Sequence, residues 1–186
     1  LETKPEKAIK LEKDALAQIE TITVDNARLV SNLHANLGGL YRMNGHPDLA
    51  REHMEKSISL LDQFNLLHIN DSIPQIANYA MFLTEQQEPE RGISELQKLS
   101  GIIKEYHSDD CLDYAKVQET LGTIYLMTAN LPQAKTHFKR AFKIYEKIWA
   151  DEPEMIEAKY QEIQELYPQV GFFLGQQLSD FLTKQT

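Results

Sequence analysis

Large apolar and small residues recur along the chain at a fixed interval. The segment 37–41 (LGGLY) is matched 84 positions later by 121–125 (LGTIY), and 79–83 (YAMFL) lies halfway between them. Each segment has a large residue at its first and fifth positions and a small residue at its second. In a helix, these three residues lie on one face. The pattern predicts a repeat of 42 residues in three copies.

A second series follows each segment with spacings of four and three residues, which are also helical. The aligned triplets are Ala50, Met54 and Ser57, then Gly92, Leu96 and Leu99, then Ala134, Phe138 and Ala141. Each unit is therefore predicted to be two helices, with small residues where the helices cross.

Prolines mark the expected start of each second helix. Pro5, Pro47 and Pro89 are spaced by 42 residues, and Pro132 is one residue late. Proline suits the first turn of a helix, because the backbone N–H groups there have no partner within the helix. Asn130 and the turn at 44–46 supply cap and turn residues just before two of these prolines.

The register divides the chain into a single repeat domain with incomplete ends. The predicted parts are a second helix of an incomplete repeat at 1–22, repeats at 27–66, 71–107 and 110–150, a degenerate first helix at 152–168, and a closing helix at 169–186. The chain begins with Leu1 rather than Met. We therefore expect it to be a segment of a longer polypeptide.

The motif Leu-Gly-x-x-Tyr, a small residue nine positions on, and then an aromatic residue and alanine resembles the tetratricopeptide repeat. Residues 115–148 match it best, and the resemblance covers about residues 5–168. The 42-residue length is similar to the repeats of kinesin light chains and many bacterial regulatory proteins. The sequence departs from the pattern at Gly92 and Gln164. The resemblance implies an all-α fold, a right-handed α-solenoid of antiparallel helix pairs.

Composition narrows the kinds of partner. The net charge of −9 opposes direct binding of nucleic acid, which favours clustered Lys and Arg. No apolar run approaches the roughly 18 residues of a membrane span. We therefore expect no contact with a membrane. A lone cysteine, Cys111, cannot form an internal disulfide, so we expect a cytoplasmic protein.

In tetratricopeptide proteins the first helices line a concave groove, and the resemblance implies which residues of this chain face it. The candidate ligand-binding residues are Asn36, Arg42, Asn78, Glu85, Lys116, Thr120, Glu162 and Glu165. Asn36 and Asn78 share one repeat position, where related proteins hold a peptide backbone. The alternative is that these amides are simply exposed. A clamp for a C-terminal carboxylate is disfavoured, because Ala35, Gly39 and Thr120 do not fit it.

Acidic residues are concentrated in 151–166, where Glu162 and Glu165 would face the groove and favour a ligand with a basic end. A solvated acidic face is the alternative interpretation. Methionines at groove positions, such as Met43, could add an adaptable apolar strip.

The sequence holds none of the constellations that indicate catalysis, a cofactor or a metal. There is no His-Glu-x-x-His, phosphate-binding loop or nucleophile elbow, and the histidines are expected to be isolated at the surface. We therefore predict a non-enzymatic scaffold that binds a protein or peptide. The alternative is a structural spacer or a homo-oligomerisation element that uses the apolar residues Phe172, Phe173, Phe181 and Leu182.

Overall fold

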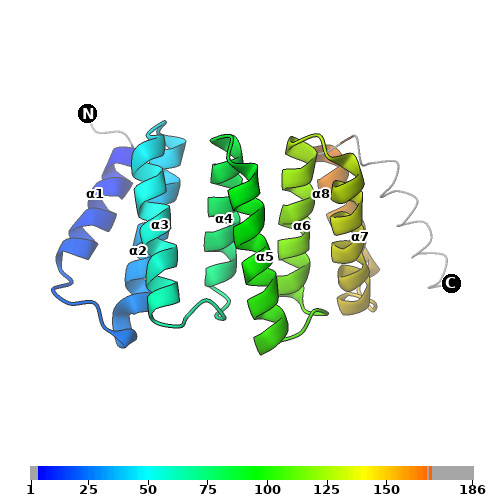
Figure 1. Cartoon of the computed structure of the whole chain (residues 1–186), viewed down its shortest axis with the longest axis horizontal. Helices are drawn as coiled ribbons and strands as arrows, with labels where there is room; N and C mark the ends of the chain where they lie inside the picture. Colours follow the sequence, from blue (N-terminus) through cyan, green and yellow to red (C-terminus); the bar gives the residue numbers. More distant parts are fainter. Residues whose placement is uncertain (1–3, 167, 169–186) are drawn as a thin grey trace. The chain divides into compact units, whose positions relative to one another are not determined.

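The computed structural model describes residues 4–166 and 168 (Figure 1). Within this part, the chain forms eight α-helices and no strand, as the sequence predicts. The helices are α1 (Lys4–Ala17), α2 (Val24–Met43), α3 (Pro47–Gln63), α4 (Ser72–Glu85), α5 (Pro89–Tyr106), α6 (Leu112–Met127), α7 (Leu131–Ile148) and α8 (Pro153–Leu166). None of these helices is both long and apolar enough to cross a membrane.

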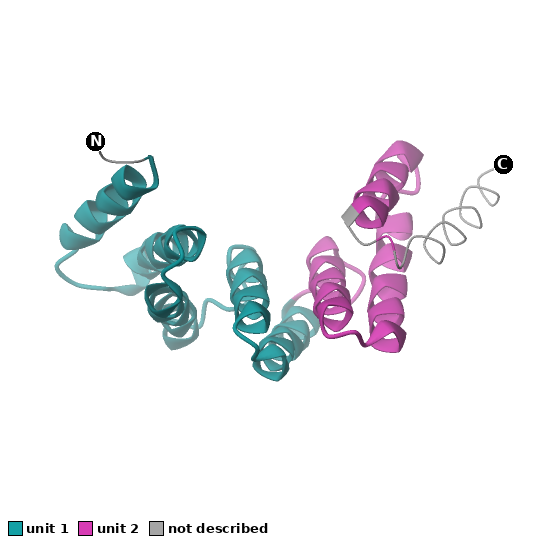
Figure 2. Cartoon of the chain, turned by 90° about the horizontal axis from the view of Figure 1, so that it is seen from above, with its two compact units in different colours: residues 1–106 teal, residues 107–186 magenta. Residues whose placement is uncertain are grey.

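The chain divides into two compact units, which Figure 2 colours separately. Unit 1 is residues 1–106 and contains α1 to α5; unit 2 is residues 107–186 and contains α6 to α8. In unit 1, α2 packs against α3 and α4 against α5; in unit 2, α6 packs against α7. The predicted closing helix at 169–186, with the apolar residues proposed for self-association, lies outside the described residues.

The turn inside each helix pair has the same geometry in all three pairs. Gly45, Gln87 and Ala129, spaced by 42 residues, all have positive φ, at 72°, 63° and 58°. The N–H of the next residue reaches back over the last turn of the helix, as from His46 to the Tyr41 carbonyl at 2.9 Å. This αL ending satisfies carbonyl groups that the helix leaves without partners. The 42-residue period therefore extends to backbone conformation.

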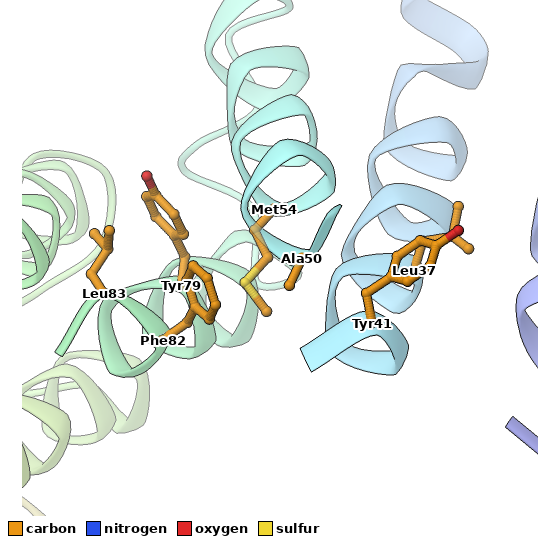
Figure 3. Close-up of a cluster of buried hydrophobic side chains, with 7 residues drawn as sticks. All are labelled: Leu37, Tyr41, Ala50, Met54, Tyr79, Phe82 and Leu83. Atoms are coloured by element: carbon orange, nitrogen blue, oxygen red, sulfur yellow. The ribbon is translucent and has the colours of Figure 1, made fainter. Parts of the chain in front are cut away.

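One part of the core of unit 1 is a cluster of side chains from α2, α3 and α4 (Figure 3). Its members are Leu37, Tyr41, Ala50, Met54, Tyr79, Phe82 and Leu83, all of them at most 5% exposed. Ile9 and Leu16 of α1 pack against the cluster. The predicted repeat positions of α2, α3 and α4 thus lie in the core.

In unit 2, α8 is anchored by three buried side chains at spacings of four and three, Ile156, Tyr160 and Ile163. The Tyr160 ring packs on Phe142 of α7, with 4.1 Å between the ring centroids. The Tyr160 hydroxyl donates to Glu146 at 2.9 Å. An apolar stripe and the hydrogen bond of Tyr160 therefore help to fix α8 to α7.

Candidate functional site

Two adjoining cavities lie between α2 and α4 of unit 1, with volumes of about 460 and 390 Å³. They share three lining residues, Ala35, Gln75 and Asn78. Together they form what we call the α2/α4 groove. The remaining lining residues are Asn32, Asn36, Gly39, Arg42, Met43, Met54, Ser57, Asp71, Pro74 and Glu85.

An ion pair joins α2 to the α4 side at each end of the groove. Arg42 forms a bidentate pair with Glu85, in which Nε lies 2.8 Å from Oε2. Arg28 donates from Nε to Asp71 Oδ2. Both pairs have the arginine on α2 and the acid 43 residues later. They are expected to set the distance between the two walls.

The floor of the groove is a chain of hydrogen-bonded side chains. Gln75 Oε1 accepts from the hydroxyls of Ser31, at 2.8 Å, and Ser57, at 2.5 Å. Gln75 Nε2 donates to Asn32 Oδ1 at 2.6 Å, and Asn32 Nδ2 donates to Asp71 Oδ2 at 3.3 Å. The chain thus runs from two buried serines to the surface ion pair of Arg28 and Asp71.

The two asparagines singled out from the sequence have different surroundings. Asn78 is exposed, lines both cavities, and makes no hydrogen bond within the described part of the chain. Asn36 lines the smaller cavity, and its Nδ2 donates to Glu12 Oε1 of α1 at 3.0 Å. One amide is therefore available to a ligand, and the other is partly engaged.

Gln75 and its two serine partners are not among the residues predicted for the site. A signal was present, because Ser31 occupies a register position held by Ile73 and Ala115 in the other repeats. Ser57 similarly stands where the other repeats have apolar residues. Polar residues at buried register positions need hydrogen-bond partners, and a search for those partners would have pointed to this groove.

Unit 2 has a smaller cavity of about 310 Å³ between α6 and α8. Two residues predicted from the sequence, Lys116 and Glu162, line it. Its other lining residues are mainly apolar: Leu112, Tyr145, Trp149, Met155, Ala158 and Lys159. Of the remaining predicted residues, Thr120 donates to the Lys116 carbonyl at 2.9 Å and Glu165 is exposed.

A half-buried ionic cluster lies beside this cavity. Lys159 Nζ is 2.9 Å from Glu119 and 3.1 Å from Glu162, and the Tyr145 hydroxyl donates to Glu119 at 2.7 Å. Burial opposes the charge on Lys159, but the two carboxylates outweigh it and raise its pKa. Burial, followed by Glu119, raises the pKa of Tyr145. Glu119 therefore links α6 to both α7 and α8.

The expectation of isolated surface histidines is wrong for His34, His53 and His137, which are half-buried. His34 and His53 share a hydrogen bond of 2.8 Å between their Nδ1 atoms. His137 makes the equivalent bond to Gln118 Oε1 at 2.9 Å, 84 positions later. The spacing of residues within one helix does not reveal hydrogen bonds between side chains of two different helices. Within the described residues, no three His, Cys, Asp or Glu side chains are placed to hold a metal ion.

We expect the histidine pair to make the fold sensitive to acid, and His34→Gln to reduce that sensitivity. Burial, followed by the charges of His53 and Lys56, lowers the pKa of His34 from 6.5 to about 4. The unfolded chain then binds more protons in this window, so the free energy of unfolding falls as the pH drops from 6.5 towards about 4. Glutamine should keep the hydrogen bond to His53, as Gln118 does to His137.

The measurement is the melting temperature as a function of pH across this window. His34→Gln should flatten the curve, whereas His46→Gln, which removes an exposed histidine, should leave it unchanged. Equal slopes for the wild type and His34→Gln would show that the pair does not titrate on unfolding.

Comparisons with known proteins agree with this structure. A family model described as tetratricopeptide repeat matches residues 72–147. The solved structure titled "Crystal structure of BtubC (BKLC) from P. vanneervenii" superposes with a TM-score of 0.74 at 17% identity, and covers 97% of this chain and 74% of that chain. At this identity the likeness shows the fold alone. No curated protein shows significant sequence similarity.

The family match and the shared fold confirm the predicted helical repeat. Tetratricopeptide repeats are in general non-catalytic scaffolds for protein interactions. The chain therefore has a tetratricopeptide-like helical repeat fold, and its residues 72–147 are similar to the tetratricopeptide repeat family.

Proposed function

We propose that this protein binds an extended segment of a protein partner in the α2/α4 groove. The observation that carries the proposal is the pair of adjoining cavities, which share Ala35, Gln75 and Asn78 and run along both helices. The predicted residues Asn36, Arg42, Asn78 and Glu85 all line these cavities. Amides that line an open groove can both donate to and accept from a peptide backbone.

The size of the groove fits a short extended segment. Arg28 and Arg42 are 14 residues apart on α2, a distance of about 21 Å at 1.5 Å per residue. An extended chain covers this distance with about six residues, at roughly 3.3 to 3.6 Å each. Ala35, Gly39 and Pro74 have small side chains and line the groove between the two ion pairs. The backbone of a partner can therefore approach the amides.

Arg42 and Glu85 have a supporting role in this proposal. They bind each other, so an approaching ligand meets a closed ion pair instead of a free charge. A bidentate pair fixes the geometry of both side chains. We infer that it holds the groove at a constant width, which lowers the cost of ordering the site when a partner binds.

The test is selection of linear peptides from a displayed random library, followed by titration of the selected synthetic peptides. Replacing Asn36 and Asn78 together by alanine should weaken binding by about tenfold, because two amide contacts of modest net energy are removed. Gln97→Ala removes an exposed amide from α5 and serves as the matched control. Unchanged affinity in the double variant, at unchanged helicity and melting temperature, would exclude the groove as the binding site.

A further inference from the structure

The amides on the floor of the α2/α4 groove have a fixed orientation, and Asp71 sets it. Arg28 hydrogen-bonds to Asp71 and lowers the pKa of its carboxyl group, so Asp71 is an ionised group that only accepts. Asn32 must therefore direct Nδ2 at Asp71 and Oδ1 at Gln75.

The same constraint passes to the next amide. Because Asn32 presents its oxygen, Gln75 must donate from Nε2, and its Oε1 must face the two serine hydroxyls. The serines alone could not decide this, since a hydroxyl either donates or accepts. The direction of all these hydrogen bonds is thus determined by one carboxylate, that of Asp71, at the surface end of the series.

A consequence is that the floor offers donors. Each amide nitrogen carries two hydrogens. The hydrogen bonds among these side chains use one hydrogen of Asn32 and one of Gln75. Gln75 Oε1 accepts two hydrogen bonds from the serine hydroxyls, and Asn32 Oδ1 accepts one from Gln75. The second hydrogens of these two residues, both of which line the groove, are therefore donors that remain for a ligand.

Charge distinguishes between two kinds of acceptor on the ligand. The groove is lined by Arg42, Glu85 and Asp71, with Arg28 paired to Asp71, so its formal charges cancel. A carboxylate entering this groove would lose water without gaining an unpaired cation. A neutral carbonyl needs only the N–H donors.

We propose that Asp71 orients the side chains of Asn32 and Gln75 as a pair of N–H donors, and that these donors bind backbone carbonyl groups of an uncharged, extended segment of a partner protein. This inference rests on the proposed function and specifies the ligand: the segment is internal to the partner, and its main-chain oxygens face the floor. A chain end with a free carboxylate is excluded as the preferred occupant.

The experiment uses the complete chain and two libraries of N-acetylated hexapeptides made of uncharged residues. One library ends in a carboxamide and the other in a free carboxylate. Each is passed over the immobilised protein, and the retained peptides are measured by mass spectrometry. The wild type is expected to retain the carboxamide library, and Asp71→Asn to retain about tenfold less, because the amide chain loses the group that fixes its direction.

Asp62→Asn is the matched control. It removes the acid of an exposed ion pair between α3 and α5, 3.6 Å from Lys98 Nζ and outside the groove lining, so retention should stay within about twofold of the wild type. Adding Asn32→Asp to Asp71→Asn puts an acceptor-only group beside Gln75, restores the direction of its amide, and should recover part of the retention. Helicity and melting temperature are measured for every variant.

Each outcome separates the two proposals. Equal retention by the wild type and Asp71→Asn, with loss in the Asn36 and Asn78 double variant, would overturn the orienting role of Asp71 and leave the groove function in place. Retention of the free-carboxylate library alone would overturn the assignment of a backbone carbonyl ligand. Retention of neither library by the folded wild type would overturn the groove function itself.

Discussion

Replacing Gly92 by alanine is expected to lower the free energy of unfolding by about 2 kcal/mol, although alanine favours a helix over glycine by about 1 kcal/mol. A Cβ atom at position 92 would lie 2.6 Å from the carbonyl oxygen of Ala80, across the α4/α5 crossing. Overpacking costs roughly 1–3 kcal/mol, and more where the obstacle is backbone that cannot rotate away. Thermal unfolding followed by circular dichroism should show a decrease of about 4–8 °C.

The same helix provides the matched control. Gly101 also lies in α5, but it is exposed, and a Cβ atom there would have no neighbour within 4 Å. Gly101→Ala should therefore stabilise the fold by roughly 0.5–1 kcal/mol, the helix propensity of alanine alone. If Gly92→Ala stabilised the protein as Gly101→Ala does, close approach of the two backbones would not be the reason for the glycine.

The other repeats suggest how the substitution at Gly92 could be rescued. The 42-residue register places one glycine and one alanine at each helix crossing: Gly38 and Ala50 in the first repeat, Gly122 and Ala134 in the third, but Ala80 and Gly92 in the second. Exchanging the pair, as Ala80→Gly with Gly92→Ala, reproduces the arrangement of the other two repeats. The double variant should recover more than half of the lost stability, with non-additivity typical of residues in contact.

This exchange shows what periodicity can and cannot predict. The positions of the helix pairs follow from the 42-residue register, because the core positions need residues of particular size on one face. The same register makes Gly92 look like a defect when it is compared with Ala50 and Ala134. Its reason lies in the partner residue Ala80 on the facing helix, and a comparison within one helix does not include that residue.

The site was predicted less completely for a similar reason. The resemblance to the tetratricopeptide repeat implies groove positions for Asn78, Arg42 and Glu85, and all three residues line the cavities between α2 and α4. The ion pair between Arg42 and Glu85 and the bond from Asn36 to Glu12 join different helices. Such contacts depend on side-chain direction and interhelical distance, which a one-dimensional pattern does not specify.

Replacing Glu119 by leucine is expected to cost about 2 kcal/mol, because the Tyr145 hydroxyl loses its acceptor and Lys159 loses one of its two carboxylate partners. Glu119 and Lys159 are only 17% and 19% exposed, and the Tyr145 hydroxyl also donates to Glu119. Removing one member of a fully buried pair costs roughly 3–5 kcal/mol. A smaller loss is expected here, since Lys159 retains Glu162 at 3.1 Å and some contact with water.

The double variant Glu119→Leu with Lys159→Met decides whether this loss comes from a stranded charge or from lost packing. Replacing both members of a buried pair by apolar residues of similar size is often neutral or stabilising, so the double variant should return to within about 1 kcal/mol of the wild type. Urea unfolding followed by circular dichroism measures all three proteins. A double variant as unstable as Glu119→Leu would mean that the carboxylate of Glu119 stabilises α6 against α7 through Tyr145 alone, and that Lys159 contributes little to holding α8.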